Sequence, residues 1–210
     1  LRVAHVVEEV AFRARESEFV DQASGVSVRL TVSLLENVVS NAERRALRND
    51  TQVATARLAD LFAAESAVTG KIELVFEGER EGPAAVADRV LGDGVLAVFQ
   101  RHFPAPYQGK RKTTAAEAAP DAYKPIVDWF AAGNSVVVND EGAAPAALRD
   151  VPGLVDLVQR HLPVDDRFLN AACELVLEGL HRSSLLAKVG STNGVAYGDM
   201  LRDMFADFDG

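Results

Sequence analysis

Cysteine is almost absent from this sequence, since Cys173 is the only one among 210 residues. No disulfide can form within the chain, which is typical of proteins from a reducing compartment. No apolar run approaches the roughly 18 residues that a membrane-spanning helix needs. No signal-peptide pattern opens the sequence either. We therefore expect a cytoplasmic protein with no membrane partner.

Basic residues are also scarce, because 22 Lys and Arg stand against 31 Asp and Glu, for a net charge of −9. Such a balance argues against nucleic acid as a partner. Hydrophobic residues make up 48% and charged residues 25%, which is typical of globular proteins. The length suits one large or two modest domains. Because Leu1 already lies inside an amphipathic pattern, we interpret the chain as part of a longer protein.

Motifs for nucleotide chemistry are incomplete. Gly70-Lys71 resembles the end of a phosphate-binding P-loop, but Glu65 and Ile72 occupy the places of the required glycine and Ser/Thr. "VVVNDE" resembles a magnesium-binding strand end, but Asn139 interrupts its apolar run, and we interpret it as a polar loop. The four histidines form no HExxH motif. The sequence therefore predicts no catalytic residue and no metal ligand.

Apolar residues at helical spacing predict helices over residues 3–17, 28–48, 56–70, 83–103, 123–133, 154–162, 165–188 and 198–208. The stretch 104–120 is rich in Pro, Ala, Lys and Thr and is predicted to be a loop or linker. We expect a mainly α protein in two parts, with at most a short β element.

That β element is predicted in "KIELVFEGE", where Ile72, Leu74 and Phe76 alternate with charged residues. Three acidic residues, Glu77, Glu79 and Glu81, continue the alternation. They could attract a divalent cation, or they could serve only to keep a strand edge soluble.

Arg29 occupies an unusual position. Ser27 resembles a helix N-cap, which places Arg29 in the first turn, where a cation costs about 0.3–1 kcal/mol against the helix dipole. A helix N-terminus is also a ready site for anions, and a guanidinium adds a forked donor suited to phosphate. Arg29 is therefore the one candidate cofactor-binding residue, and its alternative is a solvated surface arginine.

The motif "SGVSVRL", followed by "NAERRALRND" and "ATARLADL", resembles the small helical lid domain of AAA+ ATPases. The resemblance is to the MoxR and magnesium-chelatase I-subunit group, and within it to bacterial proteins labelled magnesium chelatase or sigma-54-interacting regulator. It continues through the segments "AFRARESEFVDQASGVSVRL", "TGKIELVFEGEREGP", "PYQGK", "DWFAAGN", "VPGLVDLV" and "SLLAK".

The resemblance implies a lid domain over residues 1–70 and an α-helical accessory domain over residues 71–210. Arg29 matches the sensor 2 arginine, which contacts nucleotide in the family. A nucleotide-binding domain would precede this chain in the parent protein. That parent would use ATP and Mg, form a ring homo-oligomer and act on a protein substrate or adaptor.

Residues from Lys71 onward form an extension beyond the compact lid, so remodelling of a partner suits the resemblance better than chelation of magnesium. The 210 residues alone would hold no cofactor and would not be an enzyme. The alternative is a stand-alone helical interaction or regulatory module without nucleotide chemistry.

Overall fold

The computed structural model describes residues 3–24, 26–106, 122–191 and 194–200. Within them lie ten helices and one three-stranded sheet, which confirms the predicted mainly helical class. The chain divides into two compact units, residues 1–101 with 140–143 and residues 102–139 with 144–210. The expected assignment of a lid domain to residues 1–70 and of an accessory domain to residues 71–210 stays a prediction.

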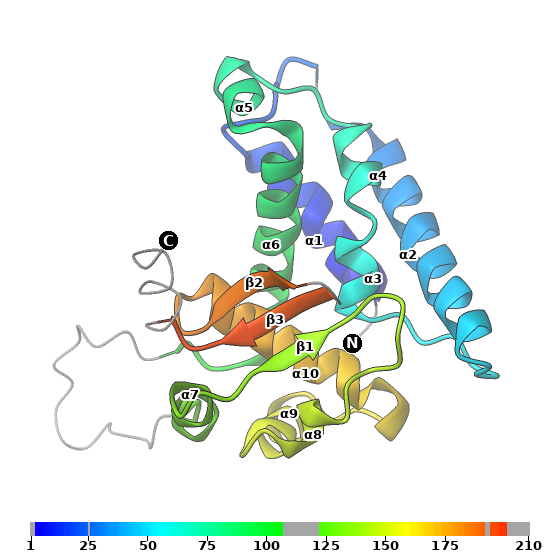
Figure 1. Cartoon of the computed structure of the whole chain (residues 1–210). Helices are drawn as coiled ribbons and strands as arrows, with labels where there is room; N and C mark the ends of the chain where they lie inside the picture. Colours follow the sequence, from blue (N-terminus) through cyan, green and yellow to red (C-terminus); the bar gives the residue numbers. More distant parts are fainter. Residues whose placement is uncertain (1–2, 25, 107–121, 192–193, 201–210) are drawn as a thin grey trace, which may run out of the picture. The chain divides into compact units, whose positions relative to one another are not determined.

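The first unit contains three long helices and three short ones (Figure 1). They are α1 (Val3–Glu16), α2 (Val28–Arg48), α3 (Leu58–Phe62), α4 (Glu65–Thr69), α5 (Phe76–Glu81) and α6 (Pro83–His102), whose last residue belongs to the second unit. The helix predicted over residues 56–70 is two helices, α3 and α4, which are separated at Ala63 and Ala64. Both pack against α2.

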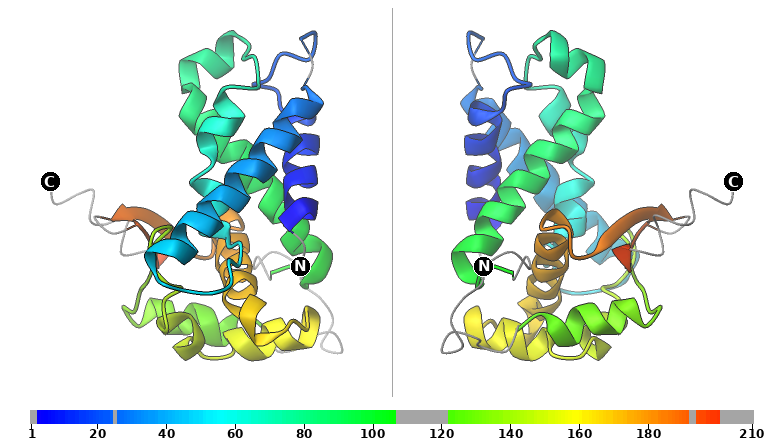
Figure 2. Two further views of the ribbon diagram at one scale, coloured as in Figure 1. Left: turned by 90° about the vertical axis from the view of Figure 1, so that its right-hand side faces the viewer. Right: turned by 90° about the vertical axis from the view of Figure 1, so that its left-hand side faces the viewer.

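Helices α1 and α6 approach each other closely at Gly94. A Cβ atom there would lie 2.5 Å from Val10 Cγ2 and 2.8 Å from Val10 Cα, so only glycine fits. Val6, Val7 and Val10 of α1 are buried, as the apolar spacing of this segment predicts. Both views of Figure 2 show α1, α2 and α6 standing close together.

The strand predicted over "KIELVFEGE" is wrong. Leu74 forms only an isolated antiparallel bridge with Val20, and α5 begins at Phe76. The alternation does not define one buried face, because Ile72 is buried whereas Phe76 is 68% exposed. A short helix instead satisfies the backbone, with Glu79 N donating to Val75 O at 2.9 Å.

The second unit combines four helices with the sheet. Its elements are α7 (Lys124–Ala131), β1 (Val136–Val138), α8 (Ala147–Asp150), α9 (Leu154–His161), α10 (Asp166–Arg182), β2 (Ala187–Ser191) and β3 (Gly194–Gly198). The sheet is antiparallel with the order β1-β3-β2, and Val136 is paired with Tyr197. The sequence predicted at most a short β element, and it placed that element at residues 71–79, outside the three strands of this small sheet.

Two of these elements correct the sequence analysis. "VVVNDE", interpreted as a polar loop, contains β1. The first and last residues of this strand, Val136 and Val138, are buried. The helix predicted over residues 165–188 ends at Arg182, and the chain turns at Ser184 with φ of 59° before it enters β2. By contrast, Gly133 follows α7 with φ of 91°, as expected for a residue that ends a helix.

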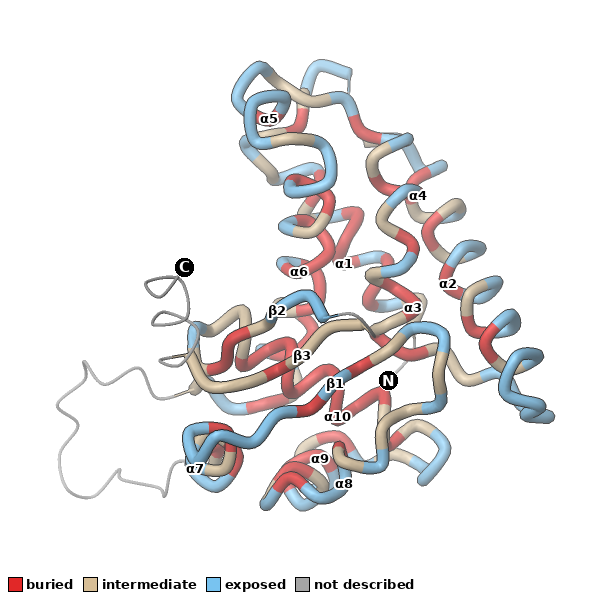
Figure 3. The backbone as a smooth tube through the Cα atoms, in the orientation of Figure 1, coloured by how far each residue is buried: buried red, intermediate tan, exposed pale blue. Residues whose placement is uncertain are grey.

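Helix α10 is the centre of the second unit. Eleven of its seventeen residues are buried, including all of residues 171–180 (Figure 3). It contacts α8 and α9, while the sheet is joined to it by side chains described below. An ordinary amphipathic surface helix buries one stripe, so this burial indicates a helix covered on several sides.

Two predictions fall partly outside the described residues. They are the loop over residues 104–120, of which 107–120 are not described, and the helix over residues 198–208, of which 201–208 are not described. Among the helices that are described, none combines the length and apolar character needed to cross a membrane.

Candidate functional site

The first turn of α2 has the geometry that the sequence predicts. Ser27 is the N-cap, with φ of −63° and ψ of 144°, and its Oγ accepts a hydrogen bond from Arg29 N at 3.1 Å. Ser27, Val28 and Arg29 are all exposed. The predicted cap is therefore confirmed, and it fixes where the side chain of Arg29 leaves the helix.

No acidic side chain within the described residues pairs with the positive charge at this helix end. The first turn of α2 contains no acidic residue, and the Arg29 guanidinium has no hydrogen-bond or ion-pair partner among the described residues. The helix dipole and the guanidinium therefore present positive potential to solvent together. Such an arrangement can bind one anionic group, such as a terminal phosphate.

The loop before α2 is ordered by a carboxylate. Asp21 Oδ1 accepts from Ala23 N at 2.8 Å, and Ser24 Oγ donates to Asp21 Oδ2 at 2.8 Å. The hydrogen bond from Ser24, followed by the one from the Ala23 amide, lowers the pKa of Asp21 below its ordinary value. Asp21 therefore remains ionised at neutral pH and holds the turn together.

This site fits only part of a nucleotide. Arg29 and the helix end suit a phosphate, but the described residues contain no cluster of three or more His, Cys, Asp or Glu that could hold a metal. Glu77, Glu79 and Glu81 lie in α5 rather than along a strand, and all three are exposed. Base, ribose and magnesium would need another domain.

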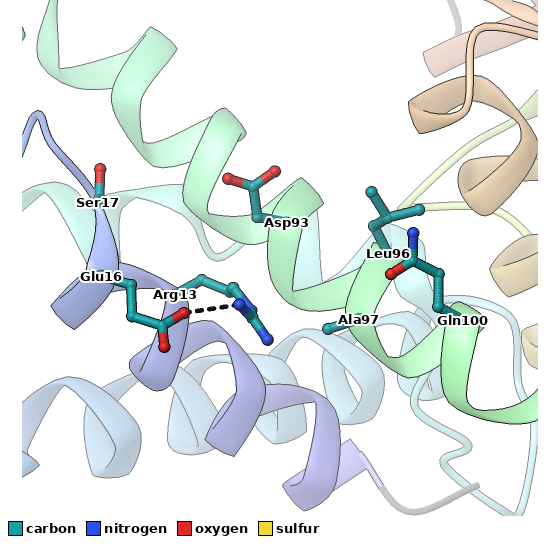
Figure 4. Close-up of a pocket in the computed structure, with 7 residues that line it drawn as sticks. All are labelled: Arg13, Glu16, Ser17, Asp93, Leu96, Ala97 and Gln100. Carbon is teal, nitrogen blue, oxygen red and sulfur yellow. Dashed lines mark hydrogen bonds and ion pairs between the residues drawn. The ribbon is translucent and has the colours of Figure 1, made fainter.

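A second place to consider is a groove of about 350 Å³ between α1 and α6 (Figure 4). Arg13 in this groove donates to Glu16 Oε2 at 2.6 Å and lies 3.7 Å from Glu9. Its two terminal nitrogens therefore already pair with carboxylates of its own helix, whereas its Nε is buried without a hydrogen-bond partner among the described residues. The other lining residues are Ser17, Asp93, Leu96, Ala97 and Gln100. We assign no chemistry to this groove.

A third place is the buried carboxylate of Glu178 on α10. Its Oε1 accepts from Arg182 Nε at 2.8 Å, and its Oε2 accepts from Tyr197 OH at 2.6 Å and lies 2.9 Å from Lys188 Nζ. Burial alone would raise its pKa, but Lys188, Tyr197 and Arg182 outweigh burial and lower it. This cluster joins β2 and β3 to α10, which is a structural role.

Burial shifts the pKa of three further groups in the second unit. Burial raises the pKa of the Cys173 thiol to about 12, so its reactive thiolate is scarce at neutral pH. Burial also raises the pKa of Tyr197 well above its ordinary value, and the Glu178 carboxylate adds to that shift. Burial lowers the pKa of His181, whose Nδ1 lies 3.0 Å from Leu186 O. We assign no chemistry to these three groups.

Comparison of the chain with protein-family models, with curated proteins and with solved structures gives no match. The resemblance to AAA+ lid domains therefore depends on the sequence segments alone and stays a prediction.

Sequence reasoning found Arg29 and its cap but not the Glu178 cluster. Glu178 and Arg182 are four residues apart on one helix face, a signal that could have paired them. Lys188 and Tyr197 join the cluster only because β2 and β3 pair in register. Nothing in the local sequence predicted that pairing.

Proposed function

We propose that this chain is the C-terminal lid and accessory region of a AAA+ ATPase of the MoxR and magnesium-chelatase type. In this role it couples ATP binding and hydrolysis in the longer protein to the remodelling of a partner in the cytoplasm. The observation that carries the proposal is Arg29, exposed and without a side-chain partner among the described residues, in a first turn capped by Ser27.

Arg29 would act as a donor to the terminal phosphate of ATP held by the nucleotide-binding domain. The guanidinium and the helix end provide the positive potential. When the terminal phosphate is hydrolysed, α2 would move, and the rest of the lid would move with it. ATP and Mg would belong to that other domain, and the ring homo-oligomer and the protein substrate or adaptor follow from the same resemblance.

The decisive experiment replaces Arg29 in the full-length protein. Because a charge-assisted contact to the reacting phosphate would be lost, Arg29→Ala should lower ATP turnover roughly 10²–10³-fold. Arg29→Lys should restore only part of the turnover, since it keeps the charge without the forked geometry. Unchanged turnover per folded molecule in Arg29→Ala would overturn the proposal.

The matched control is Arg48→Ala, at the other end of the same helix. Arg48 forms an exposed ion pair with Glu141, so its removal should leave ATP turnover nearly intact. An equal loss in both variants would indicate general damage to α2.

The 210-residue chain alone should bind ATP weakly or not at all, because one arginine and one helix end leave the base, ribose and magnesium without partners. Isothermal titration calorimetry measures this directly. A micromolar dissociation constant would mean that the chain contains a nucleotide site of its own.

The alternative is a helical interaction module without nucleotide chemistry. It is favoured by apolar side chains of α2 that remain exposed, namely Val28 at 71%, Val32 at 51% and Val39 at 42%. A surface of this kind is typical of protein contacts. Substitution of these valines by serine should then abolish partner binding while Arg29→Ala has no effect.

A further inference from the structure

The loop that leads into α2 is hydrogen-bonded to residues 73–75, which lie beyond the expected lid domain. Asp21 N donates to Glu73 O at 2.8 Å, and Val75 N donates to Phe19 O at 3.1 Å. These hydrogen bonds flank the isolated bridge between Val20 and Leu74. The chain from residue 19 to residue 21 is therefore held by backbone that lies more than fifty positions later.

Side chains strengthen the same contact. Ser24 Oγ, which is within hydrogen-bond distance of Asp21 Oδ2, also lies within hydrogen-bond distance of Glu73 Oε2, so it links the two residues. The Arg89 guanidinium of α6 lies 4.7 Å from the centre of the Phe19 ring, within the range of a cation–π contact. The loop is thus held on both sides of the bridge.

Gly78 leaves no room between α5 and this loop. A Cβ atom at residue 78 would lie 2.5 Å from Phe19 O, which is a backbone atom and cannot rotate away. Any side chain at this position must displace either the loop or α5. The absence of a side chain at Gly78 therefore fixes how closely residue 19 approaches.

We propose that residues 73–78 form a positioning clamp for Arg29, with Glu73 and Gly78 as its positioning residues. This inference rests on the proposed function. The clamp holds residues 19–24, and these lead within a few positions to the Ser27 cap that sets the start of α2. Neither Glu73 nor Gly78 needs to touch nucleotide.

The effect on turnover follows from geometry. A misplacement of about 1 Å at a reacting centre can lower a rate by roughly 10²-fold, even when the mutation lies far from the chemistry. Gly78→Ala should displace the loop and shift Arg29 while leaving its guanidinium intact. It should therefore lower kcat for ATP hydrolysis about tenfold or more, with a smaller change in KM.

The first test needs no nucleotide. Hydrogen exchange of the 210-residue chain should be faster at the amides of Asp21 and Arg29 in Gly78→Ala than in the unmodified chain. The matched control is Gly70→Ala, because a Cβ atom there would meet only Ser66 O at 3.4 Å, an ordinary contact. Unchanged exchange at both amides in Gly78→Ala would overturn the clamp, whatever the role of Arg29.

The second test is a double-mutant cycle in the full-length ATPase. If Gly78 acts through Arg29, Gly78→Ala should lower kcat in the unmodified protein but not further in Arg29→Ala. Additive losses would overturn the clamp. Unchanged turnover in Arg29→Ala alone would instead overturn the proposed function, and the exchange result would still stand.

A milder variant guards against misfolding. Glu73→Ala removes the contact to Ser24, whereas Glu73→Gln keeps an oxygen that can accept from the hydroxyl. Turnover should therefore fall in Glu73→Ala and recover in Glu73→Gln. Equal turnover in these two variants and the unmodified protein would show that the side-chain half of the clamp does not operate.

Discussion

The two ends of α2 carry arginines in opposite situations. Arg29 lies exposed in the first turn with no side-chain partner among the described residues. Arg45 lies buried in the last turns, forms an ion pair with Asp60 and donates to Thr55 O at 2.5 Å. A cation stabilises the C-terminal end of a helix and destabilises the N-terminal end. Stability therefore accounts for Arg45 and leaves Arg29 unexplained.

The surroundings of Arg45 show what a structural arginine needs. Asp60 is fully buried, and its Oδ2 accepts from Arg57 N at 2.7 Å while its Oδ1 meets Arg45. Asn41 Nδ2 donates to Asp60 O at 3.1 Å, which links the same residue back to α2. The contacts of Arg45 and Asn41 join α2 to α3 and to the chain before it, while the hydrogen bond from Arg57 N caps α3 itself. Arg29 has an unfavourable position at a helix N-terminus and no contacts of this kind among the described residues. A residue in that situation is a candidate for a functional role.

The largest effect should come from Arg45→Ala in the 210-residue chain. The substitution leaves the buried Asp60 carboxylate without its ion-pair partner, which should lower the free energy of unfolding by about 3–5 kcal/mol. Urea denaturation followed by circular dichroism measures the loss. A change below about 1 kcal/mol, the range of exposed pairs, would remove the contrast between the two ends of α2.

A smaller loss of unfolding free energy is expected from Glu178→Gln. This substitution tests whether a buried ion pair also stabilises the second unit. Removal of the carboxylate charge beside Arg182 and Lys188 weakens charge-assisted hydrogen bonds worth about 1.5–3 kcal/mol. The folded state lowers the pKa of Glu178 below its ordinary value, because Lys188, Tyr197 and Arg182 outweigh the effect of burial. Its contribution to stability is therefore present above that value and is lost as the pH falls through the lower pKa of the folded state.

The direction of this pH dependence can be checked by denaturation of the unmodified chain and of Glu178→Gln between neutral pH and pH 3. The difference in the free energy of unfolding should be full at neutral pH and should shrink in acid, as Glu178 is protonated in the unmodified chain. A difference that grows in acid would contradict the assignment of the lowered pKa.

The smallest effect, with the opposite sign, is expected for Arg29→Ala. Removal of a cation from the first turn should leave the melting temperature of the 210-residue chain unchanged or slightly raised, because the dipole penalty is only about 0.3–1 kcal/mol. Ser27→Ala is the matched control in the same turn. Loss of the cap should cost about 1 kcal/mol. If Arg29→Ala lowers the melting temperature as much as Ser27→Ala does, Arg29 is a structural residue.

Periodicity was a good guide to the long helices and a poor one to the rest of the fold. The apolar spacing of α1, α2 and α6 predicts all three helices, and each of them buries apolar residues, although Val28, Val32 and Val39 of α2 remain exposed. In "KIELVFEGE" the alternation of Ile72, Leu74 and Phe76 is real, but the second half folds as α5, whose Gly78 lies against the backbone of Phe19. The local pattern carries no information on that distant contact.

The sheet could not be predicted for a related reason. β1 is only three residues long, and β2 and β3 contain glycines at both ends of their hairpin, which weakens any strand signal. At the candidate site, the Ser27 cap is local and was predictable. The contacts of Glu73 and Gly78 with the preceding loop join distant positions, so no pattern within a single segment could reveal them.

The first unit is discontinuous in sequence, and this has a consequence for its synthesis. Asn49 Nδ2 donates to Glu141 O at 2.9 Å and Arg57 Nη1 donates to Gly142 O at 3.1 Å, across 92 and 85 positions. A ribosome adds roughly 5–20 residues per second. After residue 101 has been translated, a few seconds therefore pass before Glu141 and Gly142 are synthesised. Only then can Asn49 and Arg57 form these hydrogen bonds. The nascent first unit has to remain competent to accept Glu141 and Gly142 while the whole of α7 and β1 is being translated.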